Sequence, residues 1–207
     1  NGQITKTLYV RISNAAPSGA FTGTLTHSGG SAADTTAIIN GAVARHYYNT
    51  KANLGLNNAG TWSTTTDGTG PSPADISDPN IVFNIIEPNN VGYTGSWNLS
   101  DVNNKIIVGD GTTPLTFVIN DPITWSVKID VKNNATLKIL NKQFPVLNNL
   151  DDGSTIDFAY PGTNANTDQV SIPSRSFYNL TLTKGIKYLC SGATGSQITV
   201  RNNFVAD

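Results

Sequence analysis

Short segments in which apolar and polar residues alternate recur along most of the chain and predict β-strands. In residues 135–139, ATLKI, the apolar positions alternate with Thr136 and Lys138, which is the period-two pattern of a strand with one buried face. The same pattern occurs in VKIDV (127–131), TIDF (155–158), NLTLT (179–183) and QITV (197–200). We therefore expect buried side chains at Ile129, Val131, Leu137, Ile139, Ile156 and Phe158, and exposed ones at Lys128, Asp130 and Lys138.

The spacing of these segments favours a coiled array of strands. From Phe83 onward, apolar clusters follow one another at intervals of mostly 8 to 14 residues, and Asp-Gly-Thr/Ser recurs at Asp67, Asp110 and Asp152, about 42 residues apart. Strands and turns at such regular intervals are typical of a β-solenoid, in which each strand stacks on the next turn of the chain. An antiparallel β-sandwich, which also turns every 8–12 residues, is the alternative.

Six Asn-Asn pairs mark candidate corners of this array. They stand at 57–58, 89–90, 103–104, 133–134, 148–149 and 202–203. Asn tolerates the left-handed backbone conformation that turns need, and stacked Asn side chains can form hydrogen bonds along the axis of a solenoid. The pairs do not share the 42-residue rhythm, however, so the sandwich alternative stays open.

Composition narrows the class of protein further. Of the 207 residues only 13% are charged, about half the usual share, and the net charge is −1, which offers no basic surface for nucleic acid or membrane. Asn (25) and Thr (26) are abundant, and together with Gly they favour strands and turns over helices. The single cysteine, Cys190, cannot form an internal disulfide, and its apolar neighbours predict a small buried side chain.

No membrane span or signal peptide is visible in the sequence. No apolar run approaches the roughly 18–20 residues of a membrane span, and no signal peptide precedes the first strand-like residues, NGQITKTLYVRI. We therefore expect both ends to be cut from a longer protein.

Residues 1–44 predict three strands, at 7–13, 20–26 and 35–44. Their motifs resemble the last three strands of immunoglobulin-like modules in large secreted Bacteroidetes proteins. These motifs are YVR, G-x-F-x-G-x-L and a closing strand that contains Gly41. The matching residues are Tyr9, Val10, Arg11, Gly19, Phe21, Gly23, Leu25 and Gly41. The resemblance implies that the first half of the module is missing, so another chain or segment would have to cover the uncovered face.

Residues 45–80 predict a linker rich in aromatic residues, Gly and Pro. The order YY, Trp, DGTG, a Pro-rich stretch and VFNI is similar to a pattern that opens repetitive β regions in the same proteins. Tyr47, Tyr48, Trp62, Asp67, Gly68, Gly70, Pro71, Phe83 and Ile85 carry this similarity. We expect the three aromatic residues to join the first module to the second, with ligand stacking as the less favoured role.

Residues 81–207 predict the solenoid-like region. The last segment, from Ser174 to Phe204, resembles a coil of the parallel β-helical regions in these Bacteroidetes proteins. Phe177, Tyr178, Asn179, Leu180, Leu182, Leu189, Gly192, Ile198, Val200 and Asn202 match, whereas Cys190, Arg201 and Asn203 depart from the usual small residues. The family pattern carries no catalytic residue.

Candidates for chemistry are few. His27 and His46 are the only histidines, and neither has a second ligand at metal-binding spacing. Asp151, Asp152 and Asp157, with the distant Arg175, are the only residues that suit a polysaccharide lyase or hydrolase, and an Asp-Gly turn explains the first two equally well.

The remaining candidates are weak binding or modification sites. The Asp-Gly-Thr/Ser loops offer too few carboxylates for a dense calcium loop, so we expect no cofactor, with calcium as the minor alternative. Trp97 and Trp125 lie in alternating segments and are expected to pack in the core, and Tyr93 is a further aromatic candidate. Asp34-Thr35-Thr36 resembles the O-glycosylation sequon of exported Bacteroidetes proteins, with Thr35 as the acceptor.

Together these observations predict a non-enzymatic, all-β segment of a large extracellular, cell-surface protein, adhesin-like and of the type IX secretion cargo type. The resemblance implies a stalk, an adhesin or a filament unit. Its expected partners are other copies or neighbouring segments of the same surface protein, and glycans. A carbohydrate-binding module, recognisable by a row of exposed Trp and Tyr, is the rival class, and a polysaccharide-active β-helix enzyme is the third.

Overall fold

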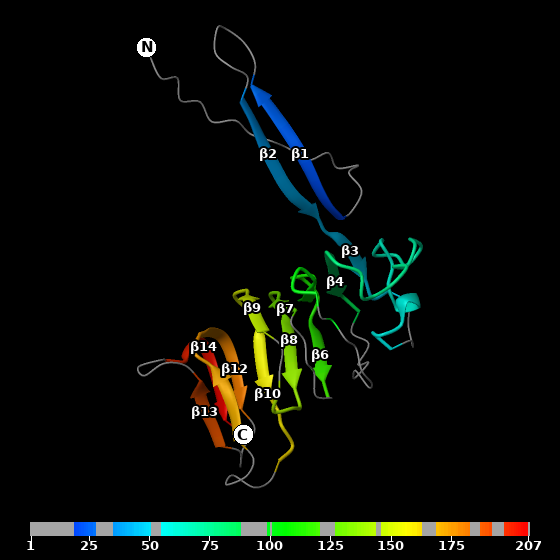
Figure 1. Cartoon of the computed structure of the whole chain (residues 1–207). Helices are drawn as coiled ribbons and strands as arrows, with labels where there is room; N and C mark the ends of the chain where they lie inside the picture. The colour runs from blue at the N-terminus through cyan, green and yellow to red at the C-terminus, as the bar shows by residue number, and fades with distance from the viewer. Residues whose placement is uncertain are drawn as a thin grey trace, which may run out of the picture. The chain divides into compact units, whose positions relative to one another are not determined.

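The structure, a computed structural model, divides into two units, Asn1–Ala44 and Arg45–Asp207 (Figure 1). It describes residues 19–27, 35–50, 55–87, 99, 101–120, 127–143, 146–162, 169–182, 187–191 and 197–206. Among these residues no helix is long and apolar enough to cross a membrane.

Unit 1 contains an antiparallel hairpin of β1 (Gly19–His27) and β2 (Thr35–Val43). These bounds confirm the second and third strands predicted for residues 1–44 to within one residue. The first of the three, at 7–13, lies outside the described residues.

The hairpin has one apolar and one polar face. Because side chains alternate along a strand, Phe21, Leu25, Ile39 and Val43 share one face. Threonines dominate the other face, which also carries the exposed Ile38. Leu25 is 40% exposed, and Phe21 lies so close over Gly41 that a Cβ added there would come within 2.3 Å of the ring. Glycine at this position therefore lets the aromatic ring lie flat on the hairpin.

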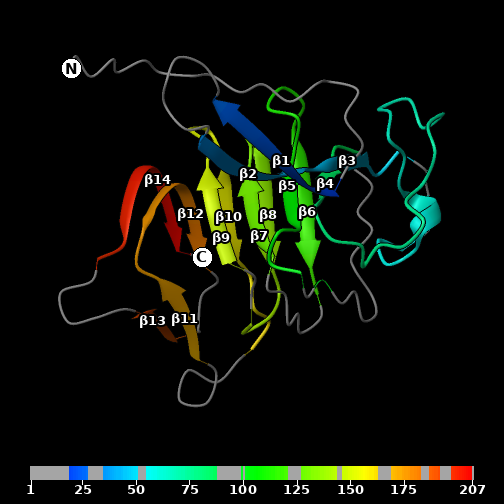
Figure 2. The same ribbon diagram turned by 45° about the horizontal axis from the view of Figure 1, so that its top comes forward.

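Unit 2 is a parallel β-solenoid, which confirms the predicted fold class. Its strands are β3 (Arg45–Tyr48), β4 (Ile81–Ile85), β5 (Lys105–Val108), β6 (Leu115–Ile119), β7 (Lys128–Val131), β8 (Ala135–Ile139), β9 (Val146–Leu150), β10 (Thr155–Phe158), β11 (Gln169–Pro173), β12 (Ser176–Leu182), β13 (Lys187–Ser191) and β14 (Thr199–Ala206). They form sheet I, in the order β3-β4-β5-β7-β9, sheet II, in the order β6-β8-β10-β12-β14, and sheet III, β11-β13. All neighbours within these sheets pair in parallel, and Figure 2 shows β7 beside β9 and β8 beside β10. The sandwich alternative is therefore wrong, since it requires antiparallel pairing.

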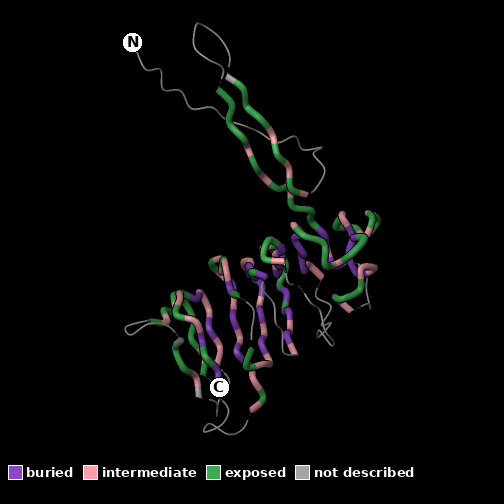
Figure 3. The backbone as a smooth tube through the Cα atoms, in the orientation of Figure 1, coloured by how far each residue is buried: buried purple, intermediate pink, exposed green. Residues whose placement is uncertain are grey.

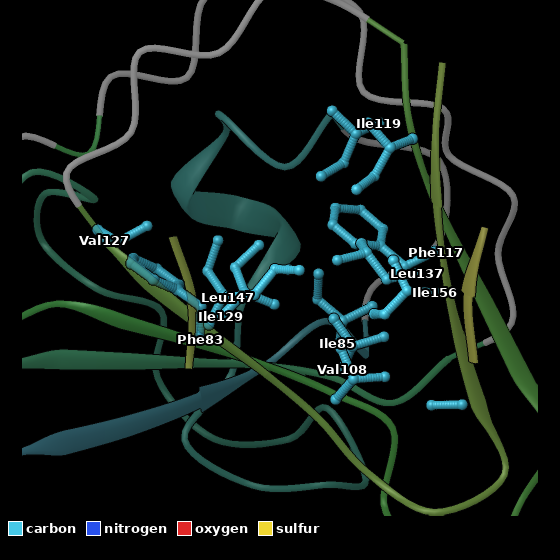
Figure 4. Packing of buried hydrophobic residues seen from close by; sticks show 14 of the residues in the cluster. Phe83, Ile85, Val108, Phe117, Ile119, Val127, Ile129, Leu137, Leu147 and Ile156 are labelled. Atoms are coloured by element: carbon cyan, nitrogen blue, oxygen red, sulfur yellow. The ribbon is translucent and has the colours of Figure 1, made fainter. Parts of the chain in front are cut away.

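The core consists of apolar rows that run from coil to coil. In sheet II, Phe117, Leu137, Ile156 and Leu180 occupy successive positions of one row, and all four are at most 3% exposed. In sheet I, a row begins at Tyr47 and continues through Phe83, Ile106, Ile129 and Leu147. Figure 3 shows the buried positions alternating along the strands, and Figure 4 shows the two rows facing each other.

The predicted register is confirmed at every apolar position and wrong at one polar position. Ile129, Val131, Leu137, Ile139, Ile156 and Phe158 are buried. Lys128 is exposed and Lys138 is half-buried, with its ammonium group near Asp157. Asp130, predicted to be exposed, is only 3% exposed, because neighbouring polar side chains cover it on the outer face of sheet I.

The corners of the solenoid stack on one another through asparagine and glycine. Asn133 Nδ2 donates to the carbonyl of Gly111 at 3.0 Å, and Asn134, whose φ of 60° is left-handed, donates to Thr112 at 3.2 Å. On the other side, a Cβ on Gly153 would come within 1.9 Å of Asn133 Oδ1. Asparagine therefore links successive corners, as its frequency led us to expect.

The other described Asn pairs do not share this corner. Asn58 accepts from the N–H of Gly60 at the start of a 3-10 turn (Ala59–Thr61), and Asn104 binds the chain around Ile81. The pairs 148–149 and 202–203 lie within β9 and β14, next to irregularities of register. The irregular spacing of the pairs thus reflects several different uses of the same residue.

Residues 45–80 belong to the solenoid rather than forming a separate linker. β3 pairs with β4 as the first rung of sheet I. Trp62 is fully buried, its ring centroid lies 4.7 Å from that of Phe83, and its Nε1 donates to the carbonyl of Leu56 at 2.9 Å. Because Tyr47 is also buried, this segment closes the apolar core at the N-terminal end of unit 2.

Truncation of Leu137 to alanine tests the core. The side chain is fully buried in the middle of its row, so we expect Leu137→Ala to lower the free energy of unfolding by about 2–5 kcal/mol in a denaturant titration. Thr136→Ala, on the outer face of the same strand, is the matched control and should change it by less than about 0.5 kcal/mol. A loss below ~1 kcal/mol for Leu137→Ala would contradict the assigned core.

Candidate functional site

The most unusual polar group of unit 2 is the Asp130 carboxylate on β7. Opposite Asp130, the register of β9 shifts, so that both Asn148 and Asn149 lie between the pairs Ile129↔Leu147 and Val131↔Leu150. This extra residue is a β-bulge, which locally interrupts the backbone ladder. Asp130 fills the interruption, because its Oδ1 accepts from the Asn149 N–H at 3.1 Å.

Three coils meet at this carboxylate. Oδ1 also accepts from Asn148 Nδ2 at 2.7 Å, and Oδ2 forms an ion pair with Lys105 Nζ, which reaches over from β5. The Asp130 side chain is 4% exposed and that of Lys105 is 31% exposed. The row of Lys105, Asp130 and Asn148 therefore links β5, β7 and β9 through one buried charge.

The contacts of this row decide the protonation of Asp130. Burial acts to raise the pKa of the carboxyl, but the contacts from Lys105, Asn148 and the Asn149 N–H outweigh burial and hold this pKa below its ordinary value. Asp130 is therefore an ionised, hydrogen-bonded carboxylate inside the wall of the solenoid.

Arg175 closes the far edge of the same sheet. Sheet I ends at β9, because β11 pairs with β13 instead. The Arg175 guanidinium donates to the carbonyls of Leu147 and Asn148 at 2.5 and 2.6 Å. Burial lowers the pKa of this guanidinium, and the two hydrogen bonds compensate carbonyls that a further parallel strand would otherwise have bound.

The C-terminal end of the solenoid presents an apolar hollow of about 410 Å³. It is lined by Ile172, Leu180, Leu182, Tyr188, Leu189, Cys190, Ile198, Val200 and Phe204. Phe204 continues the core row above Leu180 but is 55% exposed, because β14 is the last strand of sheet II. The core of unit 2 is thus closed at β3 and open at β14.

Cys190 lies at this open end, so the prediction that it is buried is wrong. It is exposed on β13, paired in register with the buried Ile172. An apolar sequence neighbourhood predicts an inward-facing position correctly, but it cannot show that, within the described residues, β13 pairs with β11 alone.

The carboxylates considered for polysaccharide chemistry do not converge. Asp152 pairs with Arg201 at 2.6 Å, Asp157 with Lys138 at 3.5 Å, and Asp151 with Lys132 at 3.4 Å. Arg175 binds backbone carbonyls instead of any of them. Each acid is thus engaged in a separate pair along the wall of the solenoid.

The Asp-Gly-Thr loops use their carboxylates in local turns. Asp67 Oδ1 accepts from Thr65 Oγ1 and from the Thr69 N–H and hydroxyl, and these contacts, that of Thr65 first, lower the pKa of Asp67 to about 2. Asp110 accepts from the N–H groups of Thr113 and Thr112, which lower its pKa to about 2 as well. Among the described residues no group of three or more His, Cys, Asp or Glu could hold a metal ion.

The aromatic candidates for ligand stacking are mostly part of the core. Trp62 and Tyr47 are buried, so the suggestion that they stack on a ligand is wrong, and Tyr48 is half-buried beside them. Tyr93, Trp97 and Trp125 lie outside the described residues.

The remaining predicted positions are reported briefly. Thr35, the predicted glycosylation acceptor, begins β2 and is exposed. His46 is exposed, and its Nδ1 lies 3.4 Å from Asn84 Nδ2. The side chain of His27 is not among those that the structure describes.

Removal of the Asp130 carboxylate tests the importance of the row. Asp130→Ala leaves Lys105 and the Asn149 N–H without their partner, so we expect it to cost about 2–3 kcal/mol of unfolding free energy. Asp157→Ala, in the more exposed pair on sheet II, is the matched control and should cost less than about 1 kcal/mol. Equal losses in a denaturant titration would contradict a special role for Asp130.

Comparison with protein-family models, with curated proteins and with solved structures found no match. The assignment to the β-solenoids therefore depends on the strand pairing described above, and the resemblance to Bacteroidetes surface proteins depends on the sequence motifs alone.

Proposed function

We propose that this chain is a structural or adhesive segment of an exported bacterial surface protein, namely a stalk, an adhesin or a filament unit. In this role unit 2 would act outside the cell as a rigid spacer, and unit 1 would contact neighbouring copies or segments of the same surface protein. The resemblance to Bacteroidetes surface proteins is the reason for naming this cellular context.

The observation that carries the proposal is the way in which successive coils bind one another. Apolar rows continue through the core, and polar side chains join the coils along the outside, as in Lys105 with Asp130, Lys138 with Asp157 and Asn133 with Gly111. Each coil is thus stabilised by contacts with the coils on either side. A stack of coils joined in this way is suited to act as a rigid spacer. These polar side chains on the outer wall therefore stabilise the fold.

A carbohydrate-binding module is the second candidate, and one observation favours it. The outer face of sheet II carries a row of small polar side chains at matching register positions, formed by Thr116, Thr136, Thr155 and Asn179. Polar side chains of this kind can form hydrogen bonds to sugar hydroxyl groups, although the row contains no aromatic residue on which a sugar could stack.

Incubation with a panel of plant and algal polysaccharides separates the three classes. We expect no release of reducing ends and no unsaturated products, because the carboxylates stand in separate ion pairs. Products that disappear in an Asp152→Asn variant would overturn the structural proposal. Binding without cleavage, lost in a Thr136→Ala/Thr155→Ala variant, would favour the carbohydrate-binding module.

Self-association of the full chain tests the role of unit 1. Its apolar face carries Leu25 and Ile39, and within the described residues of unit 1 nothing packs on that face. We expect light scattering after size exclusion to show oligomers that Leu25→Asp/Ile39→Asp abolishes. Thr24→Asp, on the threonine face of the same hairpin, should leave them intact. A strictly monomeric wild-type chain would contradict an intermolecular role for the hairpin.

A further inference from the structure

The Lys105, Asp130 and Asn148 row holds an amine and a carboxamide on either side of one carboxylate. Lys105 Nζ contacts Oδ2 of Asp130, and Asn148 Nδ2 donates to Oδ1 at 2.7 Å. The two side chains come from strands 43 residues apart in sequence and two positions apart in sheet I. An amine, a carboxamide and a shared proton acceptor are the groups that are needed to form an amide bond between two side chains.

We propose that Lys105 and Asn148 become joined by an intramolecular isopeptide bond, with Asp130 as the residue that transfers the protons. The bond would cross-link β5 to β9 over β7. It would replace the hydrogen-bonded contacts of the row by a covalent cross-link on the outer wall of the solenoid.

The reaction balances without any co-reactant. The Asp130 carboxylate accepts a proton from the Lys105 ammonium group, and the neutral amine attacks Cγ of Asn148. Rotation of the carboxamide brings its oxygen to the protonated Asp130, which donates a hydrogen bond to the developing oxyanion. As the Cγ–Nδ2 bond breaks, Nδ2 takes up the protons released by the Lys105 nitrogen and leaves as ammonium. The new Nζ–Cγ amide retains one hydrogen, and Asp130 is again a carboxylate.

The surroundings favour this reaction over hydrolysis or a simple ion pair. Asp130 is nearly inaccessible to water, and Arg175 holds the carbonyl of Asn148 at 2.6 Å, so that the backbone bearing the carboxamide is fixed. Groups held in contact react at effective concentrations far above those in solution. The bond has to form only once per molecule.

A comparison within the chain shows what is particular to this row. Lys138 and Asp157 form a similar pair between neighbouring strands of sheet II, at 3.5 Å. Among the hydrogen bonds of the described residues, none joins Asp157 to a carboxamide, so this pair has no acceptor for the amine. It therefore serves as the internal control.

Intact mass spectrometry of the denatured full chain tests the proposal. We expect the wild-type mass to lie below the sequence mass by one ammonia. Lys105→Arg preserves the positive charge but not the nucleophile, and it should restore the full mass, as should Asn148→Ala and Asp130→Asn. Lys138→Arg should keep the deficit.

Tryptic peptides then locate the bond. Because trypsin does not cleave after an acylated lysine, residues 52–128 should remain one peptide, joined to residues 143–175. A wild-type mass equal to the sequence mass would overturn the proposal. A deficit of one water would overturn Asn148 as the acceptor, and a deficit that persists in Lys105→Arg would exclude Lys105. Circular dichroism of Lys105→Arg checks that the variant folds.

Discussion

Parallel stacking imposes one constraint on almost everything in unit 2: each residue lies directly beside the residues at the same position of the coils before and after it. A position that faces the core must therefore be apolar in every coil, and a charged position on the wall must be compatible with its neighbours. Lys105 stands next to Lys128 in register, which would be unfavourable by itself. Its side chain instead pairs with Asp130, so the sheet tolerates two lysines in adjacent positions.

This constraint explains which parts of the fold were predictable from the sequence. Alternation alone identified Leu137, Ile156 and the other core positions, because a strand that is stacked on both sides needs an apolar residue at every second place. The choice between solenoid and sandwich was less certain, because both folds use short strands with turns between them. It was decided by parallel pairing, which is a property of chain segments far apart in sequence.

The errors have physical causes as well. Asp130 was predicted to be exposed because it occupies an outward-facing position in the alternating pattern of its strand. That pattern carries no information about the bulge in β9 that brings two asparagines over Asp130. Lys105 and Asn148 were missed as members of a site for the same reason. The sequence places Trp62 and Tyr47 in a linker rich in Gly and Pro. In the structure Tyr47 lies on β3 and Trp62 follows the 3-10 turn, and both aromatic rings complete the core. Only the Asn-Asn pair in VLNNL could have suggested an irregular strand, and the same pair elsewhere forms an ordinary corner.

The Arg175 contact with β9 bears on how such a protein could change its length. Neighbouring coils meet through apolar rows and, at the corner formed by Asn133 and Asn134, through asparagine side chains. A duplicated coil could reproduce such contacts on both of its faces. The boundary between β9 and β11 is different, because the two guanidinium hydrogen bonds of Arg175 belong to one specific pair of strand segments. A gene duplication that inserted a coil there would leave the arginine away from its carbonyls. Natural variants with more or fewer coils should therefore differ on either side of this boundary and preserve the junction itself.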